Sequence, residues 1–438
     1  MKIGIYHDHT LPERGGGFVL KQELLQGLGD VVSPSDIELL FFSWENSASL
    51  EQVSKNHQSY AYSEPKRGLQ LGTAFRGMLR RTFSRAIFRD IGKILRGKIR
   101  GLYHGYLVSG QGHHYSSKGQ QNSRFEHQLK DQGVDFFLFL EPWEVFTSQS
   151  LYVCINWDLA HYEDPYFPEI ISNVWEATAR SKILGLQKAM RVINGTNVLS
   201  KQVRLHAHVS EERMRVLPFP TPKDALNYAI KKKSAGSNTL PQGLSRRYLF
   251  YPASFWPHKN HAMLIKAIQV LQGTEDDYDL VFCGVNKGNK NYVARLAKEL
   301  GVNEQVHFFD FLKRKEVLEL YAHAGALVFP SLIGPDNIPP LEAFALGCPV
   351  IAGKLSGAVE QMGDAAYLFN PLEVKELVSA IKSLRTDESG WRKRIEEGRQ
   401  RASSWTADDY AEGLCAVFKE LAPYVDCCEL HSYKVQFS

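Results

Sequence analysis

Short apolar runs alternate along the chain with segments whose apolar residues recur at helical spacing. In the first half, apolar runs at 2–6, 135–142 and 151–161 alternate with a helical pattern over 18–28. In the second half, strand and helix patterns alternate from residue 247 to residue 353, and another helix is predicted to begin near 374. This alternation predicts an α/β fold with parallel sheets covered by helices on both faces.

The two series predict two Rossmann-like domains, since 438 residues suit two cores better than one. A segment rich in Pro, Lys and Ser over 219–245 is typical of an interdomain linker. We therefore expect an N-terminal domain at 1–218 and a C-terminal domain at 246–405. A last helical segment is expected at 406–425.

A basic amphipathic stretch at about 66–102 interrupts the first series. Between Lys66 and Arg100 there are eleven Lys or Arg residues and one acid, Asp90, although the whole chain carries only +4. Such a helix can lie in a membrane interface, where each cation contributes about 1 kcal/mol near anionic lipid. Alternatively, it packs on the N-terminal sheet and exposes its cations. No recognisable nucleic-acid-binding motif accompanies the charge, so we expect no nucleic-acid partner.

We expect the protein to lie in the cytoplasm, where the basic stretch would allow peripheral contact with the cytoplasmic face of the membrane. The first residues lack the apolar run of a signal peptide, and no run of about 18 apolar residues predicts a membrane span. The six cysteines show no C-x-x-C spacing, which argues against a zinc site and favours reduced thiols.

The loop 253–261 leaves a predicted strand and enters a predicted helix. Ligands of parallel sheets bind beyond the carboxyl ends of the strands, and a helix start attracts anions. Lys259 lies just before that start, where its ammonium group can meet a diphosphate, and Asn260 can cap the helix. The alternative is a capping turn with a solvated lysine.

A second loop of this kind begins at residue 331. Residues 334–337 form a predicted tight turn, Pro340 suits the first position of a helix, and Glu342 follows in its first turn. A carboxylate facing the cleft there can accept hydrogen bonds from two ribose hydroxyls. Alternatively, Glu342 only complements the helix dipole.

Together these segments resemble the retaining glycosyltransferases of family 4, which share the GT-B fold of two domains facing each other across a cleft. The resemblance covers most of 246–405 through YPASFWPHKNH, LVFCG, the run from VHFFDF to LYAHAGALVFPSL, PPLEAFALGCPVIA and GDAAYLFNP. It implies that a nucleotide-sugar donor binds to the C-terminal domain. It also implies that the last helix crosses back to the N-terminal domain.

The resemblance assigns roles to four positions of the C-terminal domain. Lys259 is expected on the donor diphosphate, whereas the accompanying arginine of the family falls on Ser254. Of two glutamates eight positions apart, the second is Glu342, expected on the ribose, and the first falls on Gly334. These departures are similar to a branch of the family that contains polysaccharide-building mannosyltransferases.

Other donor-binding residues follow from the same resemblance. Asp336, or backbone N–H groups near Asn337 and Ile338, are expected to contact the sugar in place of the absent glutamate. The glycine loop of Gly15, Gly16 and Gly17 lies where the family brings backbone close to the diphosphate. By itself, such a triplet is equally consistent with a flexible turn.

The segment 156–170 resembles the family's His-Asp-Leu loop, which faces the acceptor. Asp158 and Leu159 match, Trp157 replaces the histidine, and His161 follows closely. His161 either contacts the donor sugar, orients the acceptor hydroxyl or has a structural role. The expected catalytic set is therefore Lys259, Glu342, Asp158 and His161.

No metal or other cofactor is expected. Asp277-Tyr278-Asp279 has the Asp-x-Asp form of metal-dependent glycosyltransferases, but it precedes a strand, so we interpret it as a solvated turn away from the cleft. His113-His114 lacks a third ligand nearby and is interpreted as a polar loop. Lys259 and helix N–H groups would neutralise the leaving diphosphate.

The expected function is transfer of a hexose, mannose as the first expectation, to a glycan or lipid-linked glycan with retention of configuration. A dinucleotide-dependent oxidoreductase would need a G-x-G-x-x-G turn after a strand, which neither domain offers. Two alternatives stay open: a nucleotide-sugar-binding protein whose site has decayed, and a GT-B epimerase or phosphorylase.

Overall fold

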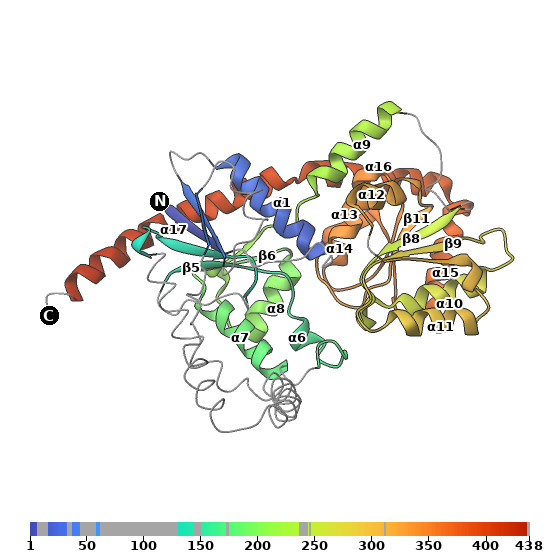
Figure 1. Cartoon of the computed structure of the whole chain (residues 1–438), viewed down its shortest axis with the longest axis horizontal. Coiled ribbons are helices and arrows are strands. Elements are labelled where there is room, and N and C mark those ends of the chain that lie inside the picture. Colours follow the sequence, from blue (N-terminus) through green and yellow to red (C-terminus); the bar gives the residue numbers. More distant parts are fainter. Residues whose placement is uncertain are drawn as a thin grey trace, which may run out of the picture.

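Two α/β domains, each built on one parallel sheet, make up the described part of the chain (Figure 1). The computed structural model describes residues 1–6, 16–32, 37–43, 58–61, 130–142, 150–171, 175–235, 244, 247–310 and 312–435. The basic stretch 66–102, the pair His113-His114 and Gly15 lie outside these residues, so the interpretations placed on them stay predictions.

The N-terminal sheet has seven strands in the order β3-β2-β1-β4-β5-β6-β7, all parallel. The strands are β1 (Lys2–Tyr6), β2 (Glu38–Ser43), β3 (Gln58–Ala61), β4 (Phe136–Phe139), β5 (Tyr152–Asn156), β6 (Arg191–Asn194) and β7 (Met214–Val216). Its helices include α1 (Gly16–Val31), α6 (Ala160–Glu163), α7 (Trp175–Lys188) and α8 (Asn197–Ala207). The strand order reverses between β1 and β4, which opens a crevice at the carboxyl end of β1.

The C-terminal sheet has six parallel strands in the order β10-β9-β8-β11-β12-β13. They are β8 (Tyr248–Pro252), β9 (Asp279–Cys283), β10 (Val306–Phe309), β11 (Ala326–Phe329), β12 (Val350–Gly353) and β13 (Tyr367–Phe369). The helices include α10 (His261–Leu271), α11 (Lys290–Glu299), α12 (Arg314–His323), α13 (Ile338–Leu346), α14 (Ala358–Met362), α15 (Val374–Thr386) and α16 (Glu388–Ser404).

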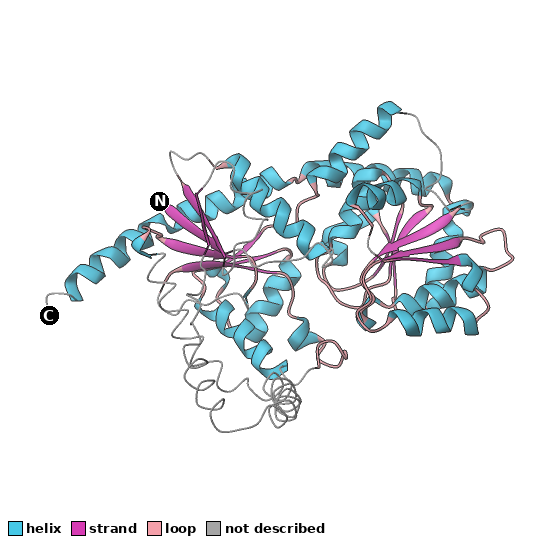
Figure 2. Cartoon of the chain, in the orientation of Figure 1, coloured by secondary structure: helices cyan, strands magenta, loops and turns pink. Residues whose placement is uncertain are grey.

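Helices cover both faces of each sheet, which confirms the predicted pair of Rossmann-like domains (Figure 2). The sequence pattern predicted most of the strands, because central parallel strands are buried on both faces and must be apolar throughout. Every residue of β4, β5, β9, β11 and β12 is buried.

The expected linker at 219–245 contains a helix, α9 (Lys223–Ala235), which packs against α13 of the C-terminal domain. The lysine-rich composition suggested a solvated linker, but one face of the helix is turned inward, and Ala225 on that face is fully buried. Lys and Ala also favour a helix by propensity. The segment therefore joins the two sheets through an ordered, packed element.

The last helix, α17 (Ala407–Val435), runs back along the N-terminal domain and packs against α1 (Figure 1). The two helices approach so closely that a Cβ at Gly27 would lie 2.7 Å from the carbonyl oxygen of Ala407. The return of the chain was expected, whereas the helix extends ten residues beyond the predicted end at 425. Among the described helices, α17 included, none combines the length and apolar character needed to cross a bilayer.

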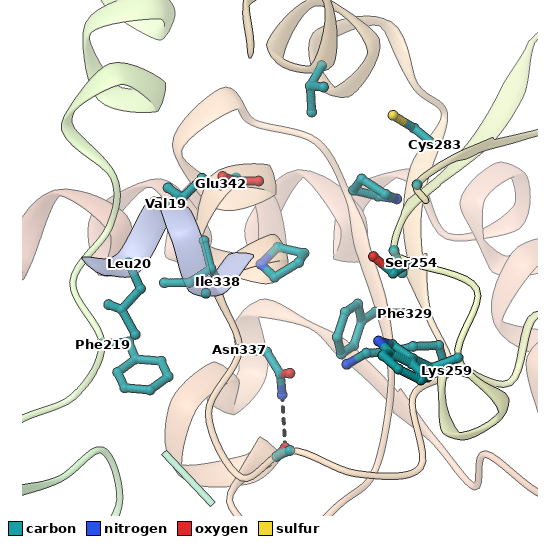
Figure 3. Close-up of a pocket in the computed structure, with 18 of the residues that line it drawn as sticks. Val19, Leu20, Phe219, Ser254, Lys259, Cys283, Phe329, Asn337, Ile338 and Glu342 are labelled. Atoms are coloured by element: carbon teal, nitrogen blue, oxygen red, sulfur yellow. Dashed lines mark hydrogen bonds between the residues drawn. The ribbon is translucent and has the colours of Figure 1, made fainter. Parts of the chain in front are cut away.

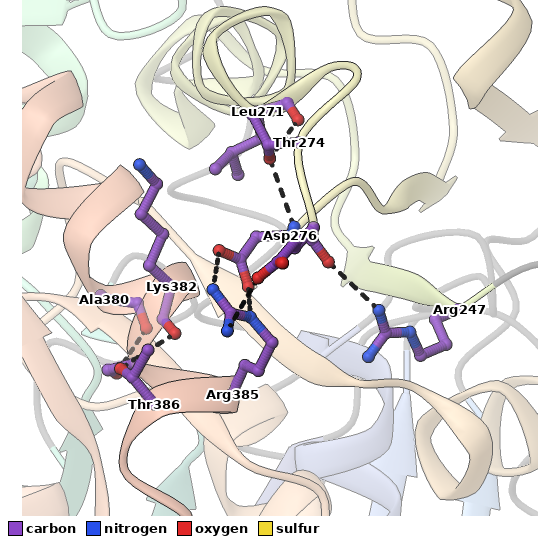
Figure 4. A network of polar contacts seen from close by, with 10 residues as sticks. Arg247, Leu271, Thr274, Asp276, Ala380, Lys382, Arg385 and Thr386 are labelled. Atoms are coloured by element: carbon purple, nitrogen blue, oxygen red, sulfur yellow. Dashed lines mark hydrogen bonds and ion pairs between the residues drawn. The ribbon is translucent and has the colours of Figure 1, made fainter.

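The turn before β9 is anchored by a polar network (Figure 4). Arg385 of α15 donates two hydrogen bonds to Asp276, whose side chain is 4% exposed, at 3.0 and 3.3 Å. Asp279 is also buried and pairs with His307 at 2.9 Å. The Asp277–Asp279 motif is thus at the amino end of β9, away from the cleft, as predicted, but the expectation of a solvated turn is wrong for Asp279.

Candidate donor site between the domains

A cavity of about 520 Å³ lies between the two domains. On the C-terminal side it is lined by the loops that follow β8, β9 and β11, and on the N-terminal side by α1 and the loop after β5. Both domains therefore contribute to one pocket at the carboxyl ends of their strands, where α/β proteins bind ligands. Its volume lies within the range of small-molecule sites, about 300–1,000 Å³.

Lys259 ends a 3-10 turn that directly precedes α10, and it lines the pocket. Its ammonium nitrogen lies 3.4 Å from Ser331 Oγ and 5.5 Å from the centre of the Phe329 ring (Figure 3). Burial lowers the pKa of Lys259 to about 8, against the opposing charges of Asp158 and Glu169. An anion that entered the pocket would replace the solvation that this ammonium has lost.

The backbone at Lys259 is held by its neighbour. Asn260 has a left-handed backbone with φ of 56°, and its side-chain amide donates to the carbonyl oxygens of Pro371 and Pro330 at 2.9 and 3.3 Å. The expected side-chain cap of α10 is therefore wrong: Asn260 occupies the N-cap position but ties the loops after β11 and β13 to the Lys259 turn. Ser254 lines the same side of the pocket, on the loop after β8 (Figure 3).

Glu342 lines the pocket, but it lies in the second turn of α13, because that helix begins at Ile338 rather than at Pro340. Its side chain is 5% exposed and forms an ion pair of 2.5 Å with Arg314 Nη1. Arg314 also donates to Asp224 of α9 through Nε at 2.6 Å and Nη2 at 2.8 Å. The pocket thus contains a second cation, which is shared between two carboxylates.

Gly334 occupies a position where a side chain does not fit. Its φ is 118°, and a Cβ would lie 2.8 Å from Asn337 Oδ1. The Asn337 amide in turn donates to the Gly334 carbonyl oxygen at 2.9 Å, the bond drawn in Figure 3. The turn therefore presents backbone and an amide at the point where the resembling family places a glutamate.

Asp336 lines the pocket, but its carboxylate already has partners. One oxygen accepts the Phe219 N–H at 2.9 Å and the other accepts the Gln361 side-chain amide. Burial raises the pKa of Asp336 to about 7, although the hydrogen bond from the Phe219 N–H opposes that rise. A Cβ at Gly195 would lie 2.3 Å from Asp336 Oδ2, so the carboxylate is wedged against the N-terminal domain. Asp336 therefore joins the domains in this structure.

The backbone N–H groups expected to contact the sugar are only partly available. The Asn337 N–H donates to Gln361 Oε1 at 3.1 Å. Ile338 lines the pocket as the first residue of α13, and the two prolines that follow carry no N–H. Within the first three positions of this helix, only Ile338 can offer a donor.

Of the expected glycine loop, Gly16 and Gly17 belong to α1, which begins at Gly16. Gly17 lines the pocket, and a Cβ there would lie 3.0 Å from the Trp157 ring. Backbone of α1 thus approaches the pocket, as expected, but as the first turn of a helix.

Asp158 lines the pocket and is paired with Lys182, a fully buried lysine, at 2.9 Å. Burial would raise the pKa of Asp158, but Lys182 and the Ala160 N–H outweigh it and lower the value to about 2. His161 lies on α6 and is not among the described residues that line the pocket. Burial lowers its pKa, and its Nδ1 has no hydrogen-bond partner among the described residues.

Several pocket residues were missed by sequence reasoning, among them Arg314, His258 and Glu23. His258 is adjacent to Lys259, so its position was predictable although its partner, Glu169, was not. Glu23 lies on α1, and burial raises its pKa to about 7. Arg314 stands at a helix start among lysines, and no local pattern distinguishes it from a solvated cation.

Residues 237–401 match the family model described as glycosyl transferases group 1. The chain is 31% identical over 148 residues to the O-antigen chain mannosyltransferase RfbU of Salmonella typhimurium. The aligned region covers 34% of this chain and 41% of that protein. The match thus spans less than half the length of this curated relative.

Two solved structures illustrate the likeness of the whole fold. Sucrose-phosphate synthase from Thermosynechococcus elongatus has a TM-score of 0.67 at 15% identity, over 96% of this chain and 98% of that chain. HepE of Anabaena in complex with UDP and glucose has a TM-score of 0.63 at 15% identity, over 96% and 100%. At such identities the likeness shows the fold alone. The match over 237–401, in contrast, shows that this chain carries a domain of the glycosyl transferases group 1 family.

Proposed function

We propose that this chain is a hexosyltransferase that uses a nucleotide-sugar donor, binds it in the interdomain pocket and transfers the sugar with retention of configuration. The observation that carries the proposal is the pocket itself, in which Lys259, on the turn before α10, and the buried Glu342 of α13 face one cavity. A cation suits a diphosphate, and a carboxylate suits vicinal hydroxyls.

The group 1 domain and the complex of HepE with UDP and glucose support a nucleotide-sugar donor. The mannosyltransferase RfbU supports mannose as the first sugar to test, with GDP-mannose as the donor. The acceptor would be a glycan or a lipid-linked glycan. Membrane contact by residues 66–102 and a place at the cytoplasmic membrane face belong to the proposal as predictions.

In this proposal the chain mainly positions substrates and stabilises charge. Lys259 neutralises the diphosphate, and Glu342 holds the ribose. Asp158, kept ionised by Lys182, faces the pocket from the acceptor side and can orient a sugar hydroxyl. No step requires a metal ion.

The test is a panel of UDP-, GDP- and dTDP-sugars, followed by melting temperature and by release of the nucleoside diphosphate. We expect GDP-mannose to raise the melting temperature most and to be turned over with acceptor or slowly with water. Lys259→Ala and Glu342→Gln should each lower turnover at least tenfold, whereas Lys266→Ala, an exposed lysine of α10, should not.

Three outcomes would contradict the proposal. Absence of any melting shift with every donor excludes the pocket as a donor site. A shift without transfer or hydrolysis supports the nucleotide-sugar-binding alternative. Transfer with inverted anomeric configuration, read by NMR of the product, contradicts retention.

A further inference from the structure

Arg314 lines the pocket and bonds to acidic residues of two other helices, α9 and α13. It opens α12, and its three guanidinium nitrogens contact two carboxylates on two other helices: Glu342 of α13 at 2.5 Å and Asp224 of α9 at 2.6 and 2.8 Å. A planar guanidinium bonded on both edges cannot rotate, so it fixes the orientation of both partners.

Glu342 depends on this contact more than Asp224 does. The Glu342 side chain is 5% exposed, whereas that of Asp224 is 42% exposed. Burial raises the pKa of Glu342, and the charge of Arg314 opposes that rise. Without the guanidinium, a buried carboxyl group would take up a proton or turn toward water, and in either case it would lose two well-placed acceptor oxygens.

Asp224 links the same guanidinium to the N-terminal domain. Its chain neighbour Lys223, the first residue of α9, donates its backbone N–H to Glu23 Oε2 of α1 at 3.0 Å. The start of α9 therefore contacts α1 on one side and Arg314 on the other. Glu23, Asp224, Arg314 and Glu342 all line the pocket.

We infer that Arg314 is a positioning residue for donor binding: it orients Glu342 toward the ribose hydroxyls, and Asp224 holds Arg314 in place from α9. This inference rests on the proposed function, in which the pocket binds a nucleoside diphosphate sugar. It predicts that Arg314 affects the recognition of ribose and has little effect on the diphosphate, which Lys259 meets.

The experiment compares two ligands on the full chain by calorimetry: GDP and 2′,3′-dideoxy-GDP, or the corresponding pair for the best donor base. In the unmodified protein, loss of both hydroxyls should weaken binding by about 10-fold or more, as expected for hydrogen bonds to a charged group. In Arg314→Met this ratio should fall toward 1, because the ribonucleotide loses its advantage. Arg314→Lys keeps a positive charge that can donate hydrogen bonds, so its ratio should lie between those of Arg314→Met and the unmodified protein.

Arg385→Met is the matched control, since it also removes an arginine from a buried carboxylate, far from the pocket. It should leave the ratio unchanged. If Arg314→Met does not fold, as judged by circular dichroism, Asp224→Asn tests the same link with Arg314 kept, and it should reduce the ratio partially.

The outcomes distinguish a failure of the proposed donor site from a failure of the positioning role of Arg314. Failure of the unmodified protein to bind any nucleoside diphosphate overturns the proposed function. Binding with a ratio near 1 in the unmodified protein, or an unchanged ratio in folded Arg314→Met or Asp224→Asn, overturns the positioning role and leaves the donor site standing.

Discussion

Glu169 and His258 join the two domains beside the pocket. The Glu169 carboxylate, on the loop after α6, contacts both the backbone N–H of His258, at 3.0 Å, and its imidazole Nδ1. The Glu169 side chain is only 7% exposed, and His258 directly precedes Lys259. The contact therefore holds the loop that carries the expected diphosphate lysine against the N-terminal domain.

Removal of this contact should loosen the arrangement of the domains. We expect Glu169→Ala to increase the radius of gyration in small-angle scattering without nucleotide, while circular dichroism stays unchanged. Each domain keeps its own sheet, so only the contact between them is weakened. Glu176→Ala, an exposed glutamate of α7, serves as the control. Superimposable scattering curves for Glu169→Ala and the unmodified protein would contradict a latch at this position.

The affinity for a diphosphate should fall at alkaline pH. The pKa of Lys259 is lowered to about 8, mainly by burial, so the free protein loses this cation as the pH rises above 8. Because the anion binds the charged form, affinity should decrease by up to about tenfold per pH unit above that value. Calorimetry from pH 7 to pH 10 measures the profile.

Lys259→Arg provides the matched variant for this profile. Arginine stays protonated over the whole range, so its affinity should vary less with pH than that of the unmodified protein. Equal slopes for the two proteins would assign the pH dependence to another group, and Lys259 would then not be the anion-binding cation.

Glu23 should make the protein less stable as the pH rises from about 4.5 to about 7. Its folded pKa is raised from 4.5 to about 7, chiefly by burial, so the folded state holds a proton that the unfolded chain releases. Stability from this group is therefore present below pH 4.5 and is lost by pH 7. Glu23→Gln, which cannot ionise, should gain about 1–3 kcal/mol relative to the unmodified protein at pH 8 compared with pH 5.

Urea unfolding at the two pH values measures this difference. Gln can accept the same hydrogen bond from the Lys223 N–H, so the variant should keep the local structure. A constant difference between Glu23→Gln and the unmodified protein at both pH values would show that Glu23 ionises normally.

Gly195 and Asp336 should behave as a coupled pair across the domain boundary. A Cβ at Gly195 would lie 2.3 Å from Asp336 Oδ2, so Gly195→Ala should cost about 1–3 kcal/mol by overpacking and should disturb the bond to the Phe219 N–H. Combined with Asp336→Ala, the added cost should shrink, because the closest contact, with Oδ2, is removed. Thermal unfolding of the two single variants and the double variant tests this, and strict additivity would contradict it.

The sequence alone determined the two sheets, most of their strands and the place of Lys259. Apolar runs and helical spacing are local patterns, and a buried parallel strand must be apolar on both faces, so such patterns survive in a single chain. The Lys259 loop was predictable for the same reason, since ligands meet the carboxyl ends of strands. Helix α9 was missed because its lysines concealed a short buried face.

Only the tertiary structure decided which charges meet. Glu169 and His258 are 89 residues apart, and Phe219 and Asp336 are 117 apart, so no local spacing relates them. Arg314 and Glu342 belong to different helices and become partners only when α12 and α13 pack. Burial gives these pairs their effect, because a carboxylate removed from water takes its orientation and its pKa from the groups around it, and the fold selects those groups.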